Sequence, residues 1–376
     1  MNMPNSFITL KTIARKALPR LMDELVFPNL CYRDFSDSFS EQGDTVQVRK
    51  PTVLTAKDFD AANGVDYEDI RESSVDVKLD RLATVDVAAG AVETAVNLGS
   101  EEALMRDFIE PACAALAEKI NADGLELYKD VAAFTGIAGT AVSSLDDLAK
   151  VRKALNDAKA PAQGRVAVLD TEADTKLVTL PSLVNAEKSG TVKALRQGSL
   201  GRVFGIDYYT SQAVKQHKTG VTASSGVKVG SAVSEGDTSL SLAATTLTGK
   251  LVKGDLLTIQ GDSYTVTEDT AAADDNAIAS VKVYPALKAY AADTAVTLIG
   301  DHTANLAFNP MAFAFVTRPL LNPDGQGVES YVTSFGGLSL RVTKGYDQKY
   351  KKSTYSMDVL YGFKTVYPEL AVRVLG

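Results

Sequence analysis

The sequence is poor in the side chains on which most enzyme and metal chemistry depends. Its 376 residues include two histidines, two cysteines and no tryptophan. Cys31 and Cys113 lie far apart without the CxxC spacing of a zinc site, and two cysteines are too few for a disulfide framework. We therefore expect reduced thiols, as in a cytosol, and neither structural zinc nor a disulfide scaffold.

Catalytic and nucleotide-binding motifs are also missing. No serine stands in a G-x-S-x-G turn, and Gly198, Gly201 and Gly205 lack the Lys-Ser/Thr of a phosphate loop. His217 and His302 flank a segment that allows them to meet, but two histidines alone make a weak metal site. The sequence predicts no enzyme, no cofactor and no metal. A carboxylate-based hydrolase stays open as an alternative, because such enzymes carry little sequence signature.

Positive charge is scarce, and long apolar runs are absent. The chain has 39 Lys and Arg against 47 Asp and Glu, a net charge of −8, and no basic tail. This balance argues against tight, sequence-independent DNA binding through a positive face. No apolar run approaches the roughly 20 residues that span a bilayer, and residues 1–10 lack the pattern of a secretory signal. We expect no membrane segment and a protein made in the cytosol.

The N-terminal region has the patterns of an arm and a long hairpin. Apolar residues at helical spacing over 6–27, interrupted near Pro19, predict either an arm that packs on a neighbouring subunit or a plain core helix. Alternating valines on either side of the turn dipeptide Asn63-Gly64 predict a two-stranded excursion over 36–86. A hairpin with so little apolar content needs a surface on which to lie.

Two helices are expected after the hairpin. The first is predicted over about 100–134, with a kink at Pro111. The second is predicted over 145–159, where Ser144 and Asp147 form a pair that resembles a capping box. A short buried strand should follow this second helix.

Residues 222–303 differ in composition from the rest of the chain. This stretch has no arginine, five lysines and ten acidic residues, so −5 of the net charge of −8 lies here. A predicted two-residue turn at Gly261-Asp262 and short alternating apolar runs indicate a small all-β barrel or sandwich with a modest core. Its acidic loop over 268–275 is either a contact surface or a solvated turn.

The C-terminal region contains three strand patterns. Residues 311–316 are apolar on both faces, which is typical of a strand buried on both sides, and Pro319 should end it. Residues 338–346 and 355–363 alternate between apolar and polar side chains, so each is predicted to have one buried face. We expect these two strands to pair as an antiparallel ribbon.

Three segments carry a resemblance to a known family: 195–207 with its spaced glycines, 305–320, and 338–370. They resemble the tailed-bacteriophage major capsid (coat) proteins, in the branch of the HK97-like fold that has an inserted β-barrel domain. The resemblance implies an α+β chain with an N-terminal arm, an extended hairpin loop, a spine helix and an axial domain. It also implies that the all-β stretch interrupts the axial domain.

The resemblance also implies domain boundaries. They are an N-terminal arm over 1–35, an extended loop over 36–86, a peripheral domain over 87–134 and 346–376, an axial domain over 135–221 and 304–345, and an inserted β-barrel domain over 222–303.

For function, the resemblance implies a structural protein of the virion. Many copies would form the pentamers and hexamers of an icosahedral shell around double-stranded DNA, which is enclosed without sequence-specific binding. A scaffolding protein, a portal protein and procapsid maturation by expansion are implied, with assembly in the cytoplasm of the bacterial host. An encapsulin-type compartment is the alternative within this fold, and a multidomain β-rich surface or adhesion protein is the alternative outside it.

A shell protein acts through its contacts, so the candidate functional residues are charged positions in the hairpin and in the acidic loop. We expect intersubunit contacts from Arg49, Lys50, Lys57, Asp58, Asp66, Glu68, Asp274 and Asp275. Some shells of this fold join a loop lysine to an asparagine of a neighbour, a position that Lys50 or Lys57 would occupy. In the branch with an inserted domain we expect shells without such crosslinks.

Overall fold

The computed structural model describes residues 10–33, 45–50, 73–90, 109–185, 196–322, 328–350 and 352–376. Strands dominate, and a few helices accompany them, as predicted for an α+β chain. The chain forms two compact units, which are described separately below. The first comprises Met1–Leu18, Arg33–Met105 and Ala314–Val366, and the second comprises Pro19–Tyr32, Arg106–Phe313 and Tyr367–Gly376.

The predicted hairpin is present in the first unit. Strand β1 (Thr45–Lys50) pairs with β2 (Ser73–Lys78) in antiparallel register, with Val46 opposite Val77. The turn at Asn63-Gly64 lies outside the described residues. Strand β3 (Arg81–Gly90) follows β2 directly and joins a different sheet, so the hairpin prediction was too long at its C-terminal end.

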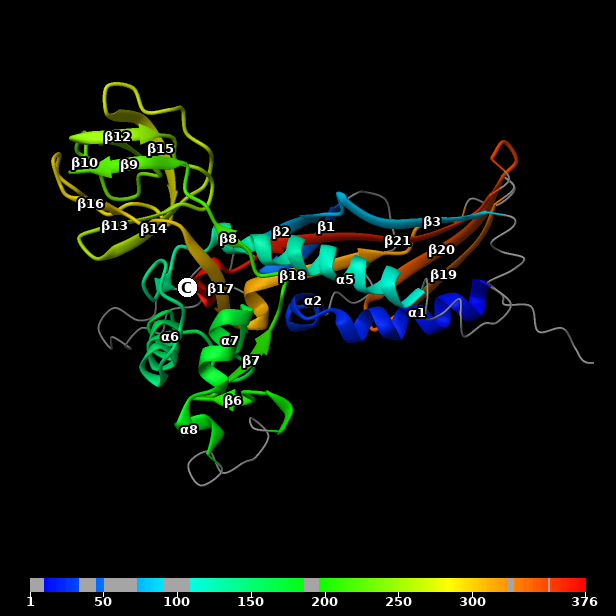
Figure 1. Ribbon diagram of the computed structural model, residues 1–376. Coiled ribbons are helices and arrows are strands. Elements are labelled where there is room, and N and C mark those ends of the chain that lie inside the picture. The colour runs from blue at the N-terminus through cyan, green and yellow to red at the C-terminus, as the bar shows by residue number, and fades with distance from the viewer. Residues whose placement is uncertain are drawn as a thin grey trace, which may run out of the picture. The chain divides into compact units, whose positions relative to one another are not determined.

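The first unit also contains a five-stranded sheet of long strands, visible in Figure 1. Its strands are β18 (Phe313–Arg318), β21 (Lys352–Thr365), β20 (Leu338–Asp347) and β19 (Glu329–Phe335) in that order, with β3 also paired to β21. Strands β20 and β21 form the predicted antiparallel ribbon, with Arg341 opposite Asp358.

Two details of these strands differ from the prediction. Residues 311–316 do not form one strand, because the 3-10 helix η3 (Pro310–Ala312) precedes β18. Proline suits the first turn of a helix, since its missing N–H is not needed there. Tyr346 was predicted on the buried face of the ribbon, but it is exposed. The buried apolar residues of the ribbon are Leu338, Leu340, Val342, Met357, Val359 and Tyr361.

The N-terminal helices are one long and one short element. Helix α1 (Leu10–Glu24) continues through Pro19, where an interruption was predicted, and α2 (Phe27–Leu30) follows. In the second unit, the buried Asn121 carboxamide accepts hydrogen bonds from Val26 N and Phe27 N and donates one to Glu24 O. This side chain satisfies the backbone groups that the corner between the two helices leaves free.

The helix predicted over about 100–134 ends earlier than expected. Helix α5 (Glu110–Leu125) has Pro111 in its first turn and tightens into the 3-10 helix η2 (Glu126–Asp130). Strand β4 (Phe134–Thr135) then pairs with the C-terminal strand. The predicted helical residues before 109 lie outside the described part of the chain.

Helix α6 (Leu145–Asp157) confirms the predicted capping pair. Ser144 Oγ accepts from Asp147 N at 3.2 Å and donates to an Asp147 carboxylate oxygen at 2.8 Å. The helices that follow are α7 (Thr171–Val178) and α8 (Pro181–Val184).

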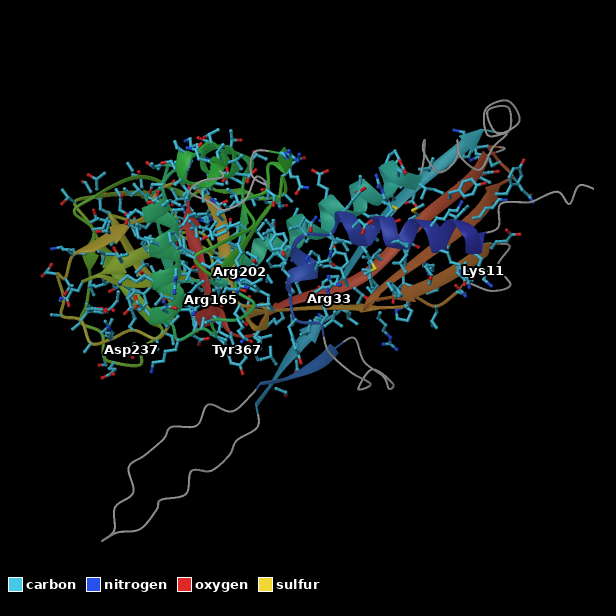
Figure 2. All side chains as sticks on the ribbon, turned by 90° about the horizontal axis from the view of Figure 1, so that it is seen from below. Lys11, Arg33, Arg165, Arg202, Asp237 and Tyr367 are labelled. Atoms are coloured by element: carbon cyan, nitrogen blue, oxygen red, sulfur yellow. The ribbon has the colours of Figure 1, made fainter. Side chains whose placement is uncertain are left out.

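A seven-stranded mixed sheet forms the core of the second unit. It consists of β4, β22 (Ala371–Leu375), β17 (His302–Phe308), β5 (Val166–Leu169), β7 (Ile206–Thr210) and β6 (Arg202–Val203) in that order, with β8 (Gln216–His217) paired to β17. Strand β5 is the predicted short buried strand. The buried Arg165, labelled in Figure 2, ties the loop before β5 to the end of α6 by donating to Pro161 O and Asn156 Oδ1.

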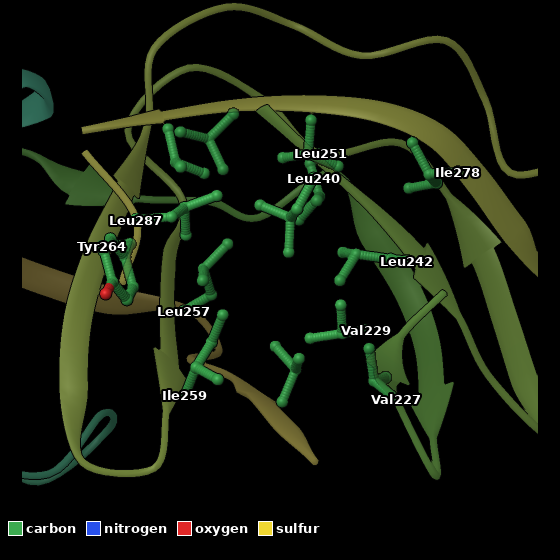
Figure 3. Close-up of a cluster of buried hydrophobic side chains, with 14 of the residues drawn as sticks. Val227, Val229, Leu240, Leu242, Leu251, Leu257, Ile259, Tyr264, Ile278 and Leu287 are labelled. Carbon is green, nitrogen blue, oxygen red and sulfur yellow. The ribbon is translucent and has the colours of Figure 1, made fainter. Parts of the chain in front are cut away.

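Between β8 and β17, the chain forms a separate barrel. Its strands are β10 (Lys228–Val229), β11 (Ser239–Ala243), β15 (Ala277–Tyr284), β14 (Asp262–Val266), β13 (Leu256–Ile259) and β16 (Val296–Leu298), in that order. A bridge between Lys228 and Ala295 brings the two ends of this sheet together. Strands β9 (Val221–Ser225) and β12 (Thr246–Gly249) form an additional pair. The barrel has its own apolar core, which Figure 3 shows around Leu240, Leu257 and Tyr264.

The predicted hairpin between β13 and β14 is present, with its turn shifted by one residue. Ile259 pairs with Asp262, so the turn residues are Gln260 and Gly261. Both have positive φ, at 52° and 93°, as a two-residue type I′ turn requires. The sequence favoured Gly261-Asp262 because Gly-Asp is also a hairpin dipeptide.

Candidate functional site: the buried seam of the inserted barrel

The chain enters and leaves the barrel at neighbouring points. In the antiparallel pair of β8 and β17, His217 lies opposite His302 and Gln216 opposite Thr303. The two imidazole rings are 5.2 Å apart between centroids. The two histidines therefore do meet. This short strand pair joins the segment before the barrel to the segment after it, and both segments belong to the core sheet.

His217 connects the core with the barrel. Its Nε2 lies 2.8 Å from Asp255 Oδ1 in the barrel, and its Nδ1 lies 2.9 Å from the Tyr128 hydroxyl in η2. Asp255 is buried and also accepts a hydrogen bond from Val252 N at 2.8 Å. A carboxylate can only accept, so Nε2 carries a proton and donates to Asp255. The other ring nitrogen, Nδ1, is the hydrogen-bond partner of the tyrosine hydroxyl.

His302 is held in the opposite tautomer. Its Nδ1 donates to Gly300 O at 2.8 Å, and its Nε2 lies 3.5 Å from Arg373 Nη1, a group that can only donate. Burial first, and then the nearby Arg373 charge, lower the pKa of His302 to about 4. His302 is therefore a neutral acceptor at pH 7.

Arg373 is the most deeply buried charge of the site. It is 0% exposed, and its hydrogen-bond acceptors among the described residues are mainly backbone carbonyls. Its guanidinium donates to Gly254 O at 2.7 Å, Tyr128 O at 2.6 Å and Val131 O at 3.0 Å. It also lies 4.9 Å from the centre of the Tyr128 ring. Burial lowers its pKa to about 9, which leaves the group charged at neutral pH.

Tyr128, His217, Asp255, His302 and Arg373 together form the buried seam between the barrel and the core. Their hydrogen bonds join these two parts of the chain. Burial raises the pKa of Tyr128 to about 12, so the phenol stays protonated and serves as a hydrogen-bonding group. Within the described ranges, no three His, Cys, Asp or Glu side chains gather closely enough to hold a metal ion. No helix of the described residues is both long and apolar enough to cross a lipid bilayer.

The predicted contact residues that the structure describes belong to other elements. Arg49 and Lys50 lie in β1, where their backbones pair with Ser74 and Ser73. The predicted positions Lys57, Asp58, Asp66 and Glu68 lie outside the described residues. Asp274 and Asp275 are exposed on the loop between β14 and β15, where Asp275 has a positive φ of 48°.

The acidic loop borders a groove of about 520 Å³ on the barrel. Two of its acids are engaged on the barrel itself, because Lys282 contacts Glu268 and Lys250 contacts Asp269, each at 2.8 Å. The hydrogen bond from Lys250 holds the pKa of Asp269 below its usual value. Asp274 and Asp275 lie beyond these pairs as exposed acidic side chains.

Sequence reasoning missed Arg373, Asp255 and Tyr128. The available signal was Arg373 itself, a single charge within the apolar run Ala-Val-Arg-Val-Leu of β22. A charged residue in a fully buried strand needs several hydrogen-bonding partners. The sequence does not reveal that these partners are backbone carbonyls more than a hundred residues away.

The folded chain is similar to solved structures of bacteriophage proteins. A protein of Mycobacterium phage Che8 matches with a TM-score of 0.52 and 19% identity, over 93% of this chain and 90% of that one. A protein from the capsid structure of Cyanophage P-SCSP1u matches with a TM-score of 0.46 and 13% identity, over 89% of this chain and 84% of that one. No curated protein matches the sequence.

Residues 179–376, more than half of the chain, match the family described as P22 coat protein, gene protein 5. The chain belongs to the P22 coat protein family. It has the HK97-like capsid fold with a small all-β domain inserted, as the sequence predicted. This P22-type coat protein is a major capsid protein that assembles with itself to form a phage shell, and its place is in the virion. Membership of this family indicates a structural role.

Proposed function

We propose that this coat protein forms the pentamers and hexamers of an icosahedral shell that encloses the double-stranded DNA of a tailed phage or prophage. The open-edged sheet of the first unit supports this proposal. Among the described strands, β3 and β19 each pair with one neighbour only. They expose Leu82 (53%) and Phe335 (69%), apolar groups that contacts between copies would cover.

A scaffolding protein and a portal protein are the further partners that we propose, with assembly in the host cytoplasm. The net charge of −8 supports a shell that encloses DNA without sequence-specific binding. One sign of charge on shell and cargo keeps the nucleic acid from adhering to the wall.

We propose the following domain roles. Residues 1–35 serve as an arm and 36–80 as an extended loop, with 87–134 in the peripheral domain and 135–221 in the axial domain. The predicted division of the C-terminal region into 304–345 (axial) and 346–376 (peripheral) was wrong, because β20 pairs with β21 in the first unit and β22 pairs with β17 in the second. Residues 222–303 form the inserted barrel. The closed barrel and the adjacent ends of β8 and β17 support this last boundary.

The intersubunit contacts that we propose are electrostatic and non-covalent. The exposed Asp274 and Asp275 support a contact of the acidic loop with a basic surface of a neighbouring copy. The loop residues Arg49, Lys50, Lys57, Asp58, Asp66 and Glu68 are proposed to contact the adjacent subunit. Mature particles should therefore run as a single monomer band on a denaturing gel, and a ladder of covalent oligomers would contradict this.

Co-expression with a scaffolding protein tests the function directly. Purified particles are imaged by electron microscopy and their nuclease-protected contents are analysed. Icosahedral shells that need the scaffold and contain DNA are expected when packaging components are present. Shells that form alone and enclose protein would favour the encapsulin alternative. A stable monomer that gives no shells, even with scaffold, would contradict the capsid function and leave the adhesion or hydrolase alternatives.

The role of the barrel is tested by replacing 222–303 with a short linker. The chain ends to be joined are close, because Thr219 N donates to Asp301 Oδ1 at 2.8 Å. We expect poor folding and misassembled particles, since the deletion leaves Arg373 without Gly254 O and His217 without Asp255. Normal shells at normal yield would indicate that the barrel is decoration.

A further inference from the structure

The barrel and the core meet along a seam where their backbones touch. Gly254, in the turn before β13, has a φ of +97°, and a Cβ added there would lie 2.7 Å from Lys129 Cγ and 3.2 Å from Lys129 Cα. Across the same seam, Thr265 Oγ1 donates to Lys129 O at 2.9 Å. A side chain at position 254 would therefore push the barrel away from η2.

Arg373 holds both sides of this seam from a third element. It projects from β22 of the core sheet, binds Gly254 O on the barrel side, and binds Tyr128 O and Val131 O on the η2 side. A guanidinium is rigid and planar, and its donors point in fixed directions. The guanidinium can donate to all three carbonyls at once only if the barrel and η2 are held in one relative position.

The other polar links across the seam are of two kinds. Lys253 with Asp130, and Tyr284 with Glu369, are hydrogen-bonded or ionic contacts in which solvent reaches the charged groups. Such exposed contacts constrain geometry little, because water and rotamer freedom compete with them. The bond from His217 to Asp255 is buried, but it joins one side chain of each part at a single point.

We propose that Arg373 is a positioning residue that fixes the direction in which the inserted barrel projects from the core. Without the Arg373 guanidinium, the barrel stays folded on its own apolar core, but its orientation relative to the core varies about the paired strands β8 and β17. In the shell, this residue would determine where the exposed acidic loop meets a neighbouring copy. That consequence rests on the proposed function, whereas the positioning itself does not.

Distances between spin labels on the free subunit test the proposal. Labels are attached to cysteines introduced at Ser280 on β15 of the barrel and at Lys153 on α6 of the core, both exposed. The native Cys31 and Cys113 are buried. For R373M, which keeps the length of the side chain but removes the donors, we expect a distance distribution about twofold broader than that of the parent. For R373K, which keeps the charge but not the planar donors, we expect an intermediate width.

Arg165 provides a matched control. It is also buried and also donates to backbone carbonyls, Pro161 O and Ala160 O, but all its partners lie within the core. R165M should lower stability and leave the distribution as narrow as in the parent, so a general loss of packing is separated from a loss of positioning. If R373M does not fold, R373K carries the test. Distributions as narrow as the parent's in the folded Arg373 variants would overturn the proposal, whatever happens in shell assembly.

Discussion

The inserted barrel and the five-stranded sheet differ in whether their edge strands are paired. In the barrel, the bridge between Lys228 and Ala295 joins the two ends of the sheet, and the apolar residues face a common interior (Figure 3). In the sheet of the first unit, β3 and β19 keep one unpaired side each within the described residues, with Leu82 and Phe335 exposed. An unpaired strand edge can bind another chain. This promotes aggregation of an isolated protein but provides a contact surface in a protein that assembles.

The difference indicates that the barrel is stabilised within one chain, whereas the sheet is suited to contacts between copies. The barrel completes its hydrogen bonds and its core within one chain, so its stability should not depend on neighbours. The sheet has one row of buried apolar side chains, and we propose that its edges are covered by neighbouring copies in the shell.

The largest effect is expected in the core of the barrel. Leu257→Ala removes a fully buried side chain, which should lower the free energy of unfolding of the barrel by about 4 kcal/mol. Leu82→Ala makes the same chemical change on the exposed edge of the sheet and should cost less than about 0.5 kcal/mol. Hydrogen exchange by mass spectrometry, read separately for barrel and sheet peptides, measures both. Equal losses of protection would break the contrast.

The next effect is a dependence on pH that is specific to the seam. The pKa of His302 is about 4 in the folded state, below its ordinary 6.5, so the unfolded chain takes up the proton first as pH falls. The stability contribution of His302 is complete above pH 6.5 and is lost between pH 6.5 and 4, which amounts to roughly 3 kcal/mol. The titratable groups that face it are Arg373, His217 and Asp255.

Urea denaturation at pH 7 and at pH 4.5 checks this dependence. His302→Gln keeps a donor for Gly300 O and an acceptor for Arg373 but does not titrate. Its loss of stability between the two pH values should be smaller than that of the parent. A variant that shows the same loss as the parent would assign the pH dependence to other groups.

A smaller effect is expected for the ion pair of the ribbon. Arg341 Nε and Nη2 donate to Asp358 Oδ2 at 2.9 and 2.6 Å, across β20 and β21. Asp358→Ala leaves a mostly buried guanidinium without its carboxylate and should cost about 2 kcal/mol in thermal or chemical denaturation. Lys153→Ala, at an exposed helical pair, is the control and should be nearly neutral.

The smallest effect on the free subunit should accompany a large effect on assembly. Phe335→Ser and Leu82→Ser replace exposed side chains, so stability should change by less than about 0.5 kcal/mol. The yield of shells should fall, because the edges of the sheet lose apolar contacts. Ser239→Ala on the barrel is a control that should affect neither quantity. Unchanged shell yield in both edge variants would remove these residues from the interface.

Patterns with a strong local cause were predictable from the sequence. The alternation in β20 and β21, the cap of α6 at Ser144 and the all-β character of the insertion follow from side-chain periodicity and short-range hydrogen bonds. The end of α5 was predicted too late, because apolar residues after Leu125 continue into a 3-10 turn and a strand instead of a helix. The seam was not predictable, since Arg373 meets carbonyls from residues 119 and 245 positions away.

The contrast between a self-contained barrel and an open sheet is tested most directly by comparing hydrogen exchange in the free subunit and in assembled shells. We expect the amides of β3 and β19 to exchange at least about tenfold more slowly in shells, while those of β13, β14 and β15 exchange at the same rate in both states. Exchange in β3 and β19 that is unchanged by assembly, or amides of β13, β14 and β15 that become protected in their place, would contradict these expectations.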